Sequence, residues 1–282
     1  MKLRRINTVQ LPAHVVNKRK RSRQRILRTI KFTLVTALFA ITIVYASLSP
    51  FFNIKEITSD GTAHYDGEVL AAASGVRTGR NGFRQMFGSS TFSGIFRIGD
   101  AERNIAKKCP YVKQAKVRYL IPSTIYIEAT EREPAAVLDM KGTRLLIDRE
   151  GYLLEIEPEN DSTKLPVIRT NQLKYADPGS KLDIPDEMLL SAFKVFDTIK
   201  EVDSVNEDKL IDEIDYVDAT DPFNICVSVE SRITVNFGKA EDLHYKINAA
   251  ISIIRKNIKK TERGTLNFST DSDPVFTPEY GG

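Results

Sequence analysis

Apolar and polar residues alternate almost strictly between Cys109 and Asp139. The alternation stops at the Leu-Ile-Pro-Ser of residues 120–123 and then resumes. Because successive side chains of a strand point to opposite faces, this pattern predicts two strands joined by a turn. Pro122 falls in the turn, where no ladder hydrogen bond needs its missing N–H. The apolar positions expected on the buried face are Ala115, Val117, Tyr119, Ile125, Ile127 and Ala129.

The segment before this hairpin predicts a strand followed by two helices. Residues 52–57 alternate as a short strand, and Asp66 and Gly75 are the candidate N-cap and C-terminal stop of the first helix. A stretch rich in Gly and Ser, expected to be a loop, leads to a second helix capped by Asp100. The order strand, helix, helix, strand, strand predicts a compact α+β unit over residues 53–130.

The second half of the chain has the pattern of a mixed β domain, predicted over residues 131–282. A β-meander with Gly-bearing turns comes first, and amphipathic helices at residues 185–201 and 241–259 alternate with further strands. GTLNFS (264–269) and PVFTP (274–278) close the chain as strands. The helix positions expected to face the core are Met188, Ala192, Val195, Phe196, Ile199, Leu243, Ile247, Ala250, Ile251, Ile254 and Ile258.

The N-terminal part has the pattern of a membrane anchor. From Phe32 to Phe52 no residue is charged, and these 21 residues would span roughly 31 Å as a helix, about the hydrocarbon thickness of a bilayer. Eleven Lys and Arg and no acidic residue precede them, although the whole chain carries only +4. The cations nearest the span are Arg19, Lys20, Arg21, Arg23, Arg25, Arg28 and Lys31. Since such cations stay in the cytoplasm, we expect a cytoplasmic segment at 1–31, a membrane helix at 32–52 and an extracytoplasmic body.

Two other interpretations of this end were weighed. Val44-Tyr45-Ala46 is a passable cleavage site for a signal peptide, but the basic leader is long for such a peptide, and cleavage would leave the body outside the cytoplasm as well. A basic arm could also bind nucleic acid, but residues 1–31 contain no aromatic side chain that could stack on bases. We therefore expect contact with acidic membrane lipid and no nucleic acid.

Residues that could bind a metal or form a disulfide are few. Cys109 and Cys226 are far apart in the sequence, and two buried thiols are expected rather than a bridge. The three histidines are isolated and show no zinc-ligand spacing. The sequence predicts no metal and no cofactor.

Two weak catalytic patterns have ordinary structural explanations. Glu131 and Glu133 are alternate residues of an extended chain, so they point to opposite sides and cannot flank one bond; Arg132 between them is expected to make surface ion pairs at a domain joint. Ser191 and Lys194 match Ser-x-x-Lys but lie on an ordinary amphipathic helix without the accompanying motifs. We expect a protein that is not an enzyme.

The end of the chain offers a different kind of site. A terminal strand often lies at the edge of a sheet, where its unpaired N–H and C=O groups can recruit a partner strand. We expect GTLNFSTDSDPVFTP to dock another protein in this way; the alternative is an ordinary closing strand packed in the core. The candidate partner-binding residues are Thr265, Leu266, Asn267, Phe268, Val275 and Phe276.

A series of short motifs resembles the FtsQ/DivIB family of bacterial cell-division proteins. The most specific are Ile-Pro-Ser-Thr-Ile-Tyr-Ile (121–127) and Glu-Arg-Glu-Pro-Ala-Ala (131–136). The others, in chain order, are Phe-Asn-Ile-Lys-Glu-Ile (52–57), Ser-Gly-Val (74–76), Cys-Pro-Tyr-Val-Lys-Gln-Ala-Lys-Val (109–117), Leu-Ile-Asp-Arg-Glu-Gly-Tyr-Leu-Leu (146–154) and Leu-Pro-Val-Ile (165–168). Two features depart from the family: residues 81–94 look like an insertion, and the sequence stops at Glu279-Tyr-Gly-Gly without the long extension of some members.

The resemblance implies an α+β fold: a single N-terminal transmembrane helix, a POTRA domain (βααββ) at 53–130 and a β domain at 131–282 that ends in partner-binding strands. It implies a non-enzymatic scaffold of the divisome at the septum, with FtsB/DivIC-like and FtsL-like coiled-coil membrane proteins as partners. In the family the POTRA domain serves recruitment. The family's last strands engage the partner; carried over by position, the best contact candidates here are the segment Thr265 to Phe276 and the adjacent face of helix 241–259.

Two other functions stay open on the sequence alone. A membrane-anchored extracytoplasmic cell-wall enzyme would need a nucleophile or a metal site. A different POTRA-type polypeptide-binding protein, such as a translocation component, would carry tandem POTRA units or a membrane barrel. Neither feature is visible in the sequence.

Overall fold

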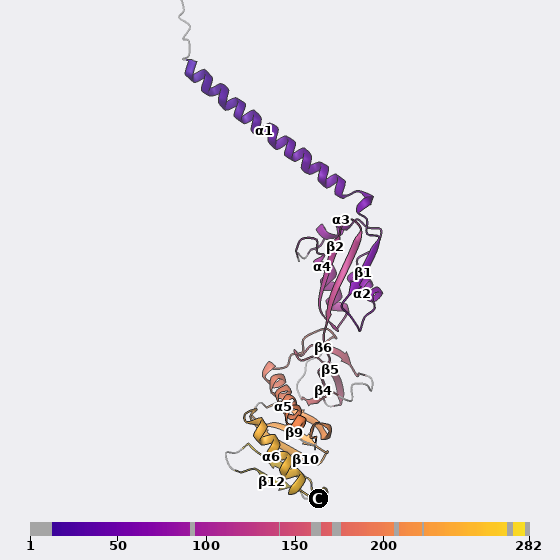
Figure 1. The fold of residues 1–282 in the computed structure, drawn as a ribbon, viewed down its shortest axis with the longest axis vertical. Coiled ribbons are helices and arrows are strands. Elements are labelled where there is room, and N and C mark those ends of the chain that lie inside the picture. The colour runs from indigo at the N-terminus through magenta and orange to yellow at the C-terminus, as the bar shows by residue number, and fades with distance from the viewer. Residues whose placement is uncertain are drawn as a thin grey trace, which may run out of the picture.

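The computed structural model describes residues 13–90, 94–140, 142–158, 165–170, 176–205, 209–221, 223–269 and 273–279. The molecule is elongated: a long N-terminal helix leads to a first small body, and a second, larger body follows it (Figure 1). The chain is a mixed α+β protein with a sheet-rich body, as the sequence predicts.

Helix α1 (Ala13–Ser47) contains the candidate membrane span. Its segment from Arg25 to Ser47 is 23 residues long, roughly 35 Å, and its side chains are almost all exposed. The helix ends five residues before the predicted end of the span, because Pro50 begins a separate 3-10 turn, η1 (Pro50–Phe52), which Ser49 caps. Of the predicted topology cations, Arg25, Arg28 and Lys31 are exposed on α1, and the side chains of residues 19–23 lie outside the described set.

The first body is a three-stranded sheet covered by helices. The strand order is β1-β3-β2, with β1 parallel and β2 antiparallel to β3. Its elements are β1 (Glu56–Asp60), α2 (Gly67–Ser74), α3 (Gly82–Phe87), α4 (Gly99–Lys108), β2 (Val112–Leu120) and β3 (Thr124–Glu131). All six apolar positions predicted for the buried face of the hairpin are buried, which confirms the face predicted from the alternation.

Helix α3 was not predicted; it lies in the stretch expected to be a loop. The Asn81 side chain accepts the N–H of Arg84 at 3.0 Å and starts the helix. At the predicted helix ends the outcome is mixed. Gly75 adopts the left-handed conformation (φ 74°) that ends α2, as expected, but Asp66 makes no side-chain cap. Asp100 lies in the first turn of α4, where its carboxylate accepts the N–H of Ser90.

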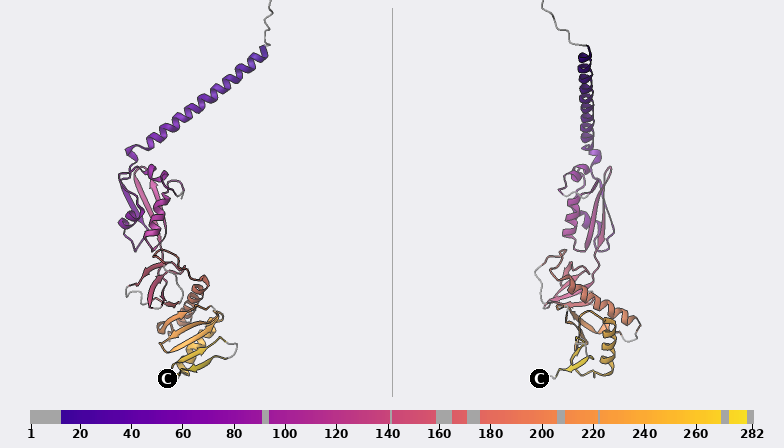
Figure 2. Two further views of the ribbon diagram at one scale, coloured as in Figure 1. Left: turned by 180° about the vertical axis from the view of Figure 1, so that it is seen from behind. Right: turned by 90° about the vertical axis from the view of Figure 1, so that its left-hand side faces the viewer.

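The second body contains one large sheet with two helices. The order of its nine described strands is β12-β11-β10-β9-β8-β7-β4-β5-β6. Its elements are β4 (Ala136–Met140), β5 (Thr143–Ile147), β6 (Leu153–Ile156), β7 (Val167–Arg169), α5 (Asp186–Val205), η3 (Ile211–Glu213), β8 (Ile214–Asp218), β9 (Ile225–Val229), β10 (Ile233–Gly238), α6 (Leu243–Lys256), β11 (Gly264–Asn267) and β12 (Val275–Pro278). Helices α5 and α6 pack with the sheet into one core, and α6 connects the parallel strands β10 and β11 (Figure 2).

A buried ion pair lies at the junction of the two bodies. The side chain of Arg132 is 8% exposed, and its Nη1 lies 2.6 Å from Asp148, which is 7% exposed. Its guanidinium also stacks on the ring of Tyr152, 3.5 Å from the centroid. The expectation of a surface ion pair at Arg132 was therefore wrong: neighbours from the second body cover this side chain. The Glu131 carboxylate meanwhile accepts the backbone N–H groups of Ala63 and His64.

A second contact at the junction comes from Tyr111. Its hydroxyl donates to Glu155 at 3.1 Å, and its ring packs against a small cluster formed by Val137, Leu146 and Leu154. Burial, together with Glu155, raises the pKa of Tyr111 to about 12, so the hydroxyl stays protonated and remains a donor. The two bodies are thus joined by specific side-chain contacts.

Candidate partner-binding edge

Strand β12 is the outermost strand at one end of the large sheet, in the part of the chain that the structure describes. It pairs with β11 on its inner side, with Thr265 opposite Thr277 and Leu266 opposite Phe276. The N–H of Glu279 donates to the carbonyl of Arg263 at 2.8 Å. Hydrogen-bonded pairs alternate in an antiparallel ladder. The backbone N–H and C=O groups of the odd-numbered residues of β12 therefore bond to β11, and those of the even-numbered residues point away from β11.

The outward side of β12 is poor in donors. Phe276 directs both its N–H and its C=O away from β11, by the alternation above. The positions two residues to either side are Pro274 and Pro278, which have carbonyls but no N–H. The edge therefore presents a single N–H between two carbonyl-only positions. Proline at such positions is a known way of preventing open-ended strand addition while an edge remains exposed.

The structure divides the six predicted contact residues into two groups. Leu266 and Phe268 are buried in the core, where the Phe268 ring lies 5.8 Å from that of Phe237. Their side chains stabilise the sheet and are poor candidates for direct contact. A sequence signal for this was present: they alternate with the polar Thr265 and Asn267, as buried positions do.

The remaining predicted residues are accessible to different degrees. Thr265 is exposed, and Asn267 is half-buried with its Oδ1 accepting the N–H of Ser269 at 2.8 Å. Val275 is 56% exposed beside Asn267 on the adjacent strand, an open apolar position. Phe276 is half-buried and packs on the core, so its contribution to the edge is its backbone. Thr277 is exposed as well and was missed, although its place in PVFTP indicated an edge residue.

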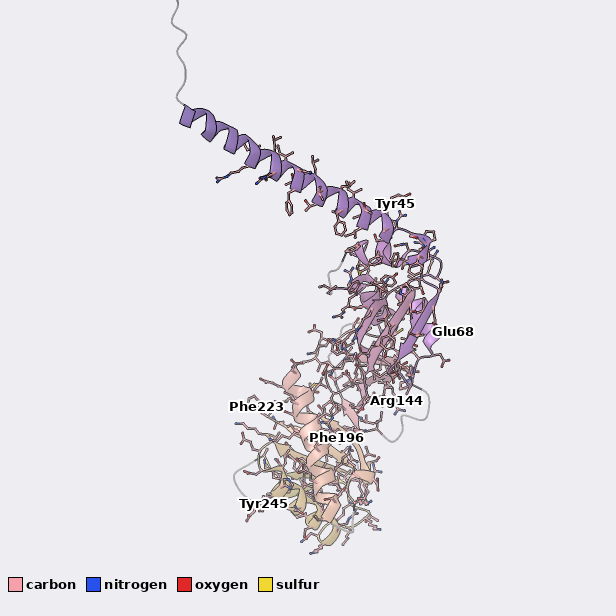
Figure 3. The ribbon with its side chains drawn as sticks, turned by 45° about the horizontal axis from the view of Figure 1, so that its top comes forward. Tyr45, Glu68, Arg144, Phe196, Phe223 and Tyr245 are labelled. Atoms are coloured by element: carbon pink, nitrogen blue, oxygen red, sulfur yellow. The ribbon has the colours of Figure 1, made fainter. Side chains whose placement is uncertain are left out.

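Helix α6 packs on the core at this end of the sheet, and its residue Tyr245 lies at the outer side of the second body (Figure 3). Ile247, Ala250 and Ile254 are buried as predicted, whereas the predicted core position Ile251 is only half-buried. Tyr245 is exposed on the opposite face. An incoming strand on β12 would extend the sheet beside this helix, which leaves both elements available to one partner.

The other candidate groups are not assembled into a reactive site. Lys194 donates to the carbonyl of Ala240 at 2.7 Å, a structural contact that explains this residue without catalysis. Cys109 and Cys226 are both free thiols, the first buried and the second half-buried, and burial raises the pKa of each. A raised pKa disfavours the reactive thiolate. Among the described residues no group of three or more His, Cys, Asp or Glu could hold a metal ion.

The fold and the edge define a class of protein: one candidate membrane-spanning helix followed by an α+β body that ends in an exposed strand. No protein-family model matches the chain. The chain is 25% identical over 258 residues to the cell division protein DivIB of Clostridium botulinum, covering 91% of this chain and 93% of that protein. It is 28% identical over 222 residues to the cell division protein FtsQ of Corynebacterium glutamicum, covering 79% and 87%. The DivIB of Clostridium acetobutylicum is 24% identical over 228 residues.

These relatives, matched over most of their own length, support the resemblance of the chain to the FtsQ/DivIB family of cell-division proteins.

Proposed function

We propose that this protein is a non-enzymatic scaffold of the division machinery that holds partner proteins at the septum. Helix α1 anchors it with the basic N-terminus in the cytoplasm and the two bodies outside. The partners are FtsB/DivIC-like and FtsL-like coiled-coil membrane proteins. The observation that carries the proposal is the outer side of β12, which no strand covers among the described residues and which can accept one more strand from another chain.

The two bodies take different parts in this proposal. The first body, residues 53–130, acts as a POTRA domain that recruits the protein to the septum. Its order of strand, helix, helix, strand, strand supports this assignment, with α3 as an additional short helix. The second body, residues 131–282, carries the binding edge.

Partner binding at β12 should depend on the backbone of Phe276. An antiparallel strand placed there would exchange two hydrogen bonds with Phe276 and donate one each to the carbonyls of Pro274 and Pro278. The partner therefore needs a free N–H at three alternate positions, which means no proline there. Apolar side chains on its outer face would pack beside Val275.

The sharpest test replaces one amide by an ester. Incorporation of phenyllactic acid at position 276 removes that N–H and keeps the side chain. The matched control is the ester analogue of valine at position 275, which removes an N–H that bonds inward to β11. Both are made in the full chain, and affinity for the purified partner is measured by isothermal titration calorimetry in detergent.

The ester at 276 should weaken binding about two- to tenfold, the value of one net hydrogen bond. The ester at 275 should lower thermal stability; because it also weakens the Pro274 carbonyl as an acceptor, it should weaken binding by the folded protein, but less than the ester at 276. Wild-type affinity of the 276 ester, or an equal loss from both esters, would overturn the edge proposal. Failure of every candidate partner to bind the wild-type chain would overturn the scaffold function itself.

A further inference from the structure

The membrane-facing end of the first body is tied directly to the end of α1. The Asn81 side chain, which also caps α3, donates to the carbonyls of Ser47 at 2.9 Å and Ser49 at 3.2 Å. The hydroxyl of Tyr119, at the end of β2, lies between the carbonyl oxygen of Phe52, at 3.1 Å, and that of Pro122. Helix α3 and the tip of the β2–β3 hairpin therefore lie beside the point where α1 ends (Figure 1).

A continuous series of aromatic rings runs from this point across α3. Phe51 contacts Phe52, with ring centroids 5.2 Å apart; Phe52 contacts Phe83 at 5.1 Å, and Phe83 contacts Phe87 at 6.4 Å. The two middle rings are half-buried, whereas Phe51 is 63% and Phe87 is 77% exposed. The hairpin tip adds Ile121, which is also exposed. Removing these apolar side chains from water would be favourable in free energy, and aromatic side chains are enriched at the membrane–water interface.

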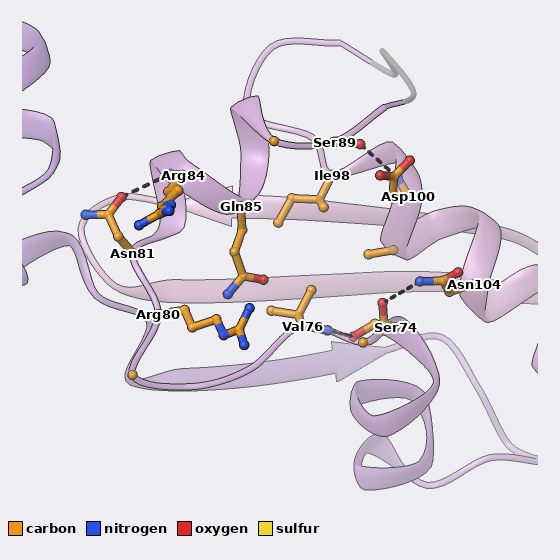
Figure 4. A pocket seen from close by; sticks show the side chains of 14 residues that line it. Ser74, Val76, Arg80, Asn81, Arg84, Gln85, Ser89, Ile98, Asp100 and Asn104 are labelled. Atoms are coloured by element: carbon orange, nitrogen blue, oxygen red, sulfur yellow. Dashed lines mark hydrogen bonds between the residues drawn. The ribbon is translucent and has the colours of Figure 1, made fainter.

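Basic side chains accompany this apolar surface. Arg80 and Arg84 are exposed, and neither forms an ion pair with another described residue. Together with Asn81 they stand at one end of a cavity of about 690 Å³ between α2, α3 and α4, while Asp100 and Asn104 line the other end (Figure 4). Lys55 is exposed near the hairpin tip, and the adjacent Glu56 offsets its charge. The arrangement places a net positive charge beside exposed rings.

We propose that this end of the first body, with Phe51, Phe87 and Ile121 as its apolar contacts, docks on the outer surface of the bilayer that α1 crosses. Arg80 and Arg84 bind the phosphates of anionic phospholipids, and the rings lie in the interfacial layer. Lipid is the expected partner of this surface because two hydrogen bonds from the Asn81 side chain hold α3 at the end of the proposed span, within reach of the bilayer. The proposal gives residues 81–90 of the apparent insertion a role and rests on the membrane anchorage proposed above.

Tryptophan fluorescence can test this, because the chain contains no tryptophan. Three single-tryptophan variants of the full chain are reconstituted into vesicles of zwitterionic and anionic phospholipid with brominated acyl chains. Phe87→Trp reports on the proposed contact. Phe39→Trp, within the span, is the membrane control, and Phe223→Trp, 62% exposed on the second body, is the solvent control.

Phe87→Trp should emit at shorter wavelength than Phe223→Trp and be quenched by shallow bromines. Phe39→Trp should be quenched most strongly by deep ones. If Phe39→Trp is quenched but Phe87→Trp behaves like Phe223→Trp, the docking proposal is wrong and the anchor stands; in that case the surface is free for another membrane protein. If Phe39→Trp is not quenched, the anchorage itself fails.

The electrostatic part has its own matched pair of variants. Arg80→Gln with Arg84→Gln in the Phe87→Trp background should lower the ratio of docked to undocked protein about fivefold per charge in anionic vesicles, corresponding to about 1 kcal/mol each. Lys256→Gln with Lys260→Gln, both exposed on the second body, should leave the ratio unchanged. Equal effects of the two pairs, or quenching that is the same in purely zwitterionic vesicles, would overturn the role of Arg80 and Arg84.

Discussion

Replacing Arg132 by Met should lower the free energy of unfolding of the two folded bodies by about 3 kcal/mol. The change leaves Asp148, which is 7% exposed, as a buried carboxylate without its cation, and breaking such a pair costs about 3–5 kcal/mol. The lower end applies because Asp148 keeps the N–H groups of Glu150 and Tyr152 at 2.9 and 2.8 Å. The stacking of Arg132 on Tyr152 is lost as well.

The measurement is urea unfolding of the full chain in detergent, followed by far-ultraviolet circular dichroism. Arg149→Met is the matched control, because Arg149 pairs with Asp197 at 2.6 Å where both side chains are exposed; it should cost no more than about 1 kcal/mol. Adding Asp148→Asn to Arg132→Met should restore part of the loss, since the buried charge is then gone. A loss for Arg132→Met no larger than for Arg149→Met would refute the argument.

Pro278→Ala adds an outward N–H to β12 and should raise partner affinity about two- to tenfold in calorimetry; unchanged affinity would count against an added strand there. Gly264→Ala places a Cβ 2.2 Å from the carbonyl oxygen of Thr277, so β12 should detach, visible as fast amide exchange in β12 alone together with lost binding. The hydrogen bond and charge of Arg149 lower the pKa of Asp197, so this carboxylate stabilises the fold above an ordinary pKa of about 3.9 and loses its effect as pH falls through the lowered value. The stability difference between wild type and Asp197→Asn should therefore be largest near neutral pH and vanish in strong acid; a constant difference would contradict this.

The hairpin and the buried faces of the two long helices of the second body could be predicted, because burial of one face imposes a period on the apolar positions of the sequence. Val117 and Ile127 are opposite one another and fully buried, as the alternation requires. Helix α3 could not be predicted in this way, because six residues are too few for a period. It depends instead on the Asn81 cap and on Gly82, whose missing Cβ makes room for the ring of Tyr119.

Two features of the candidate site also needed the structure. The direction of the Phe276 N–H depends on which residues of β11 and β12 exchange hydrogen bonds, and a shift by one residue would reverse it. The burial of Arg132 depends on Asp148 and Tyr152, which reach it only through the packing of the two bodies. Neither the direction of the Phe276 N–H nor the burial of Arg132 can be predicted from the neighbouring residues in the sequence.

Amide hydrogen exchange at Phe276, with and without the proposed coiled-coil partner, tests the central claim most directly. In the free protein this N–H has no partner on β11, whereas those of Val275 and Thr277 are bonded to it. We predict that saturating partner slows exchange at Phe276 strongly and changes it little at its two neighbours. A stoichiometric complex in which Phe276 exchanges as fast as in the free protein would contradict strand addition at β12.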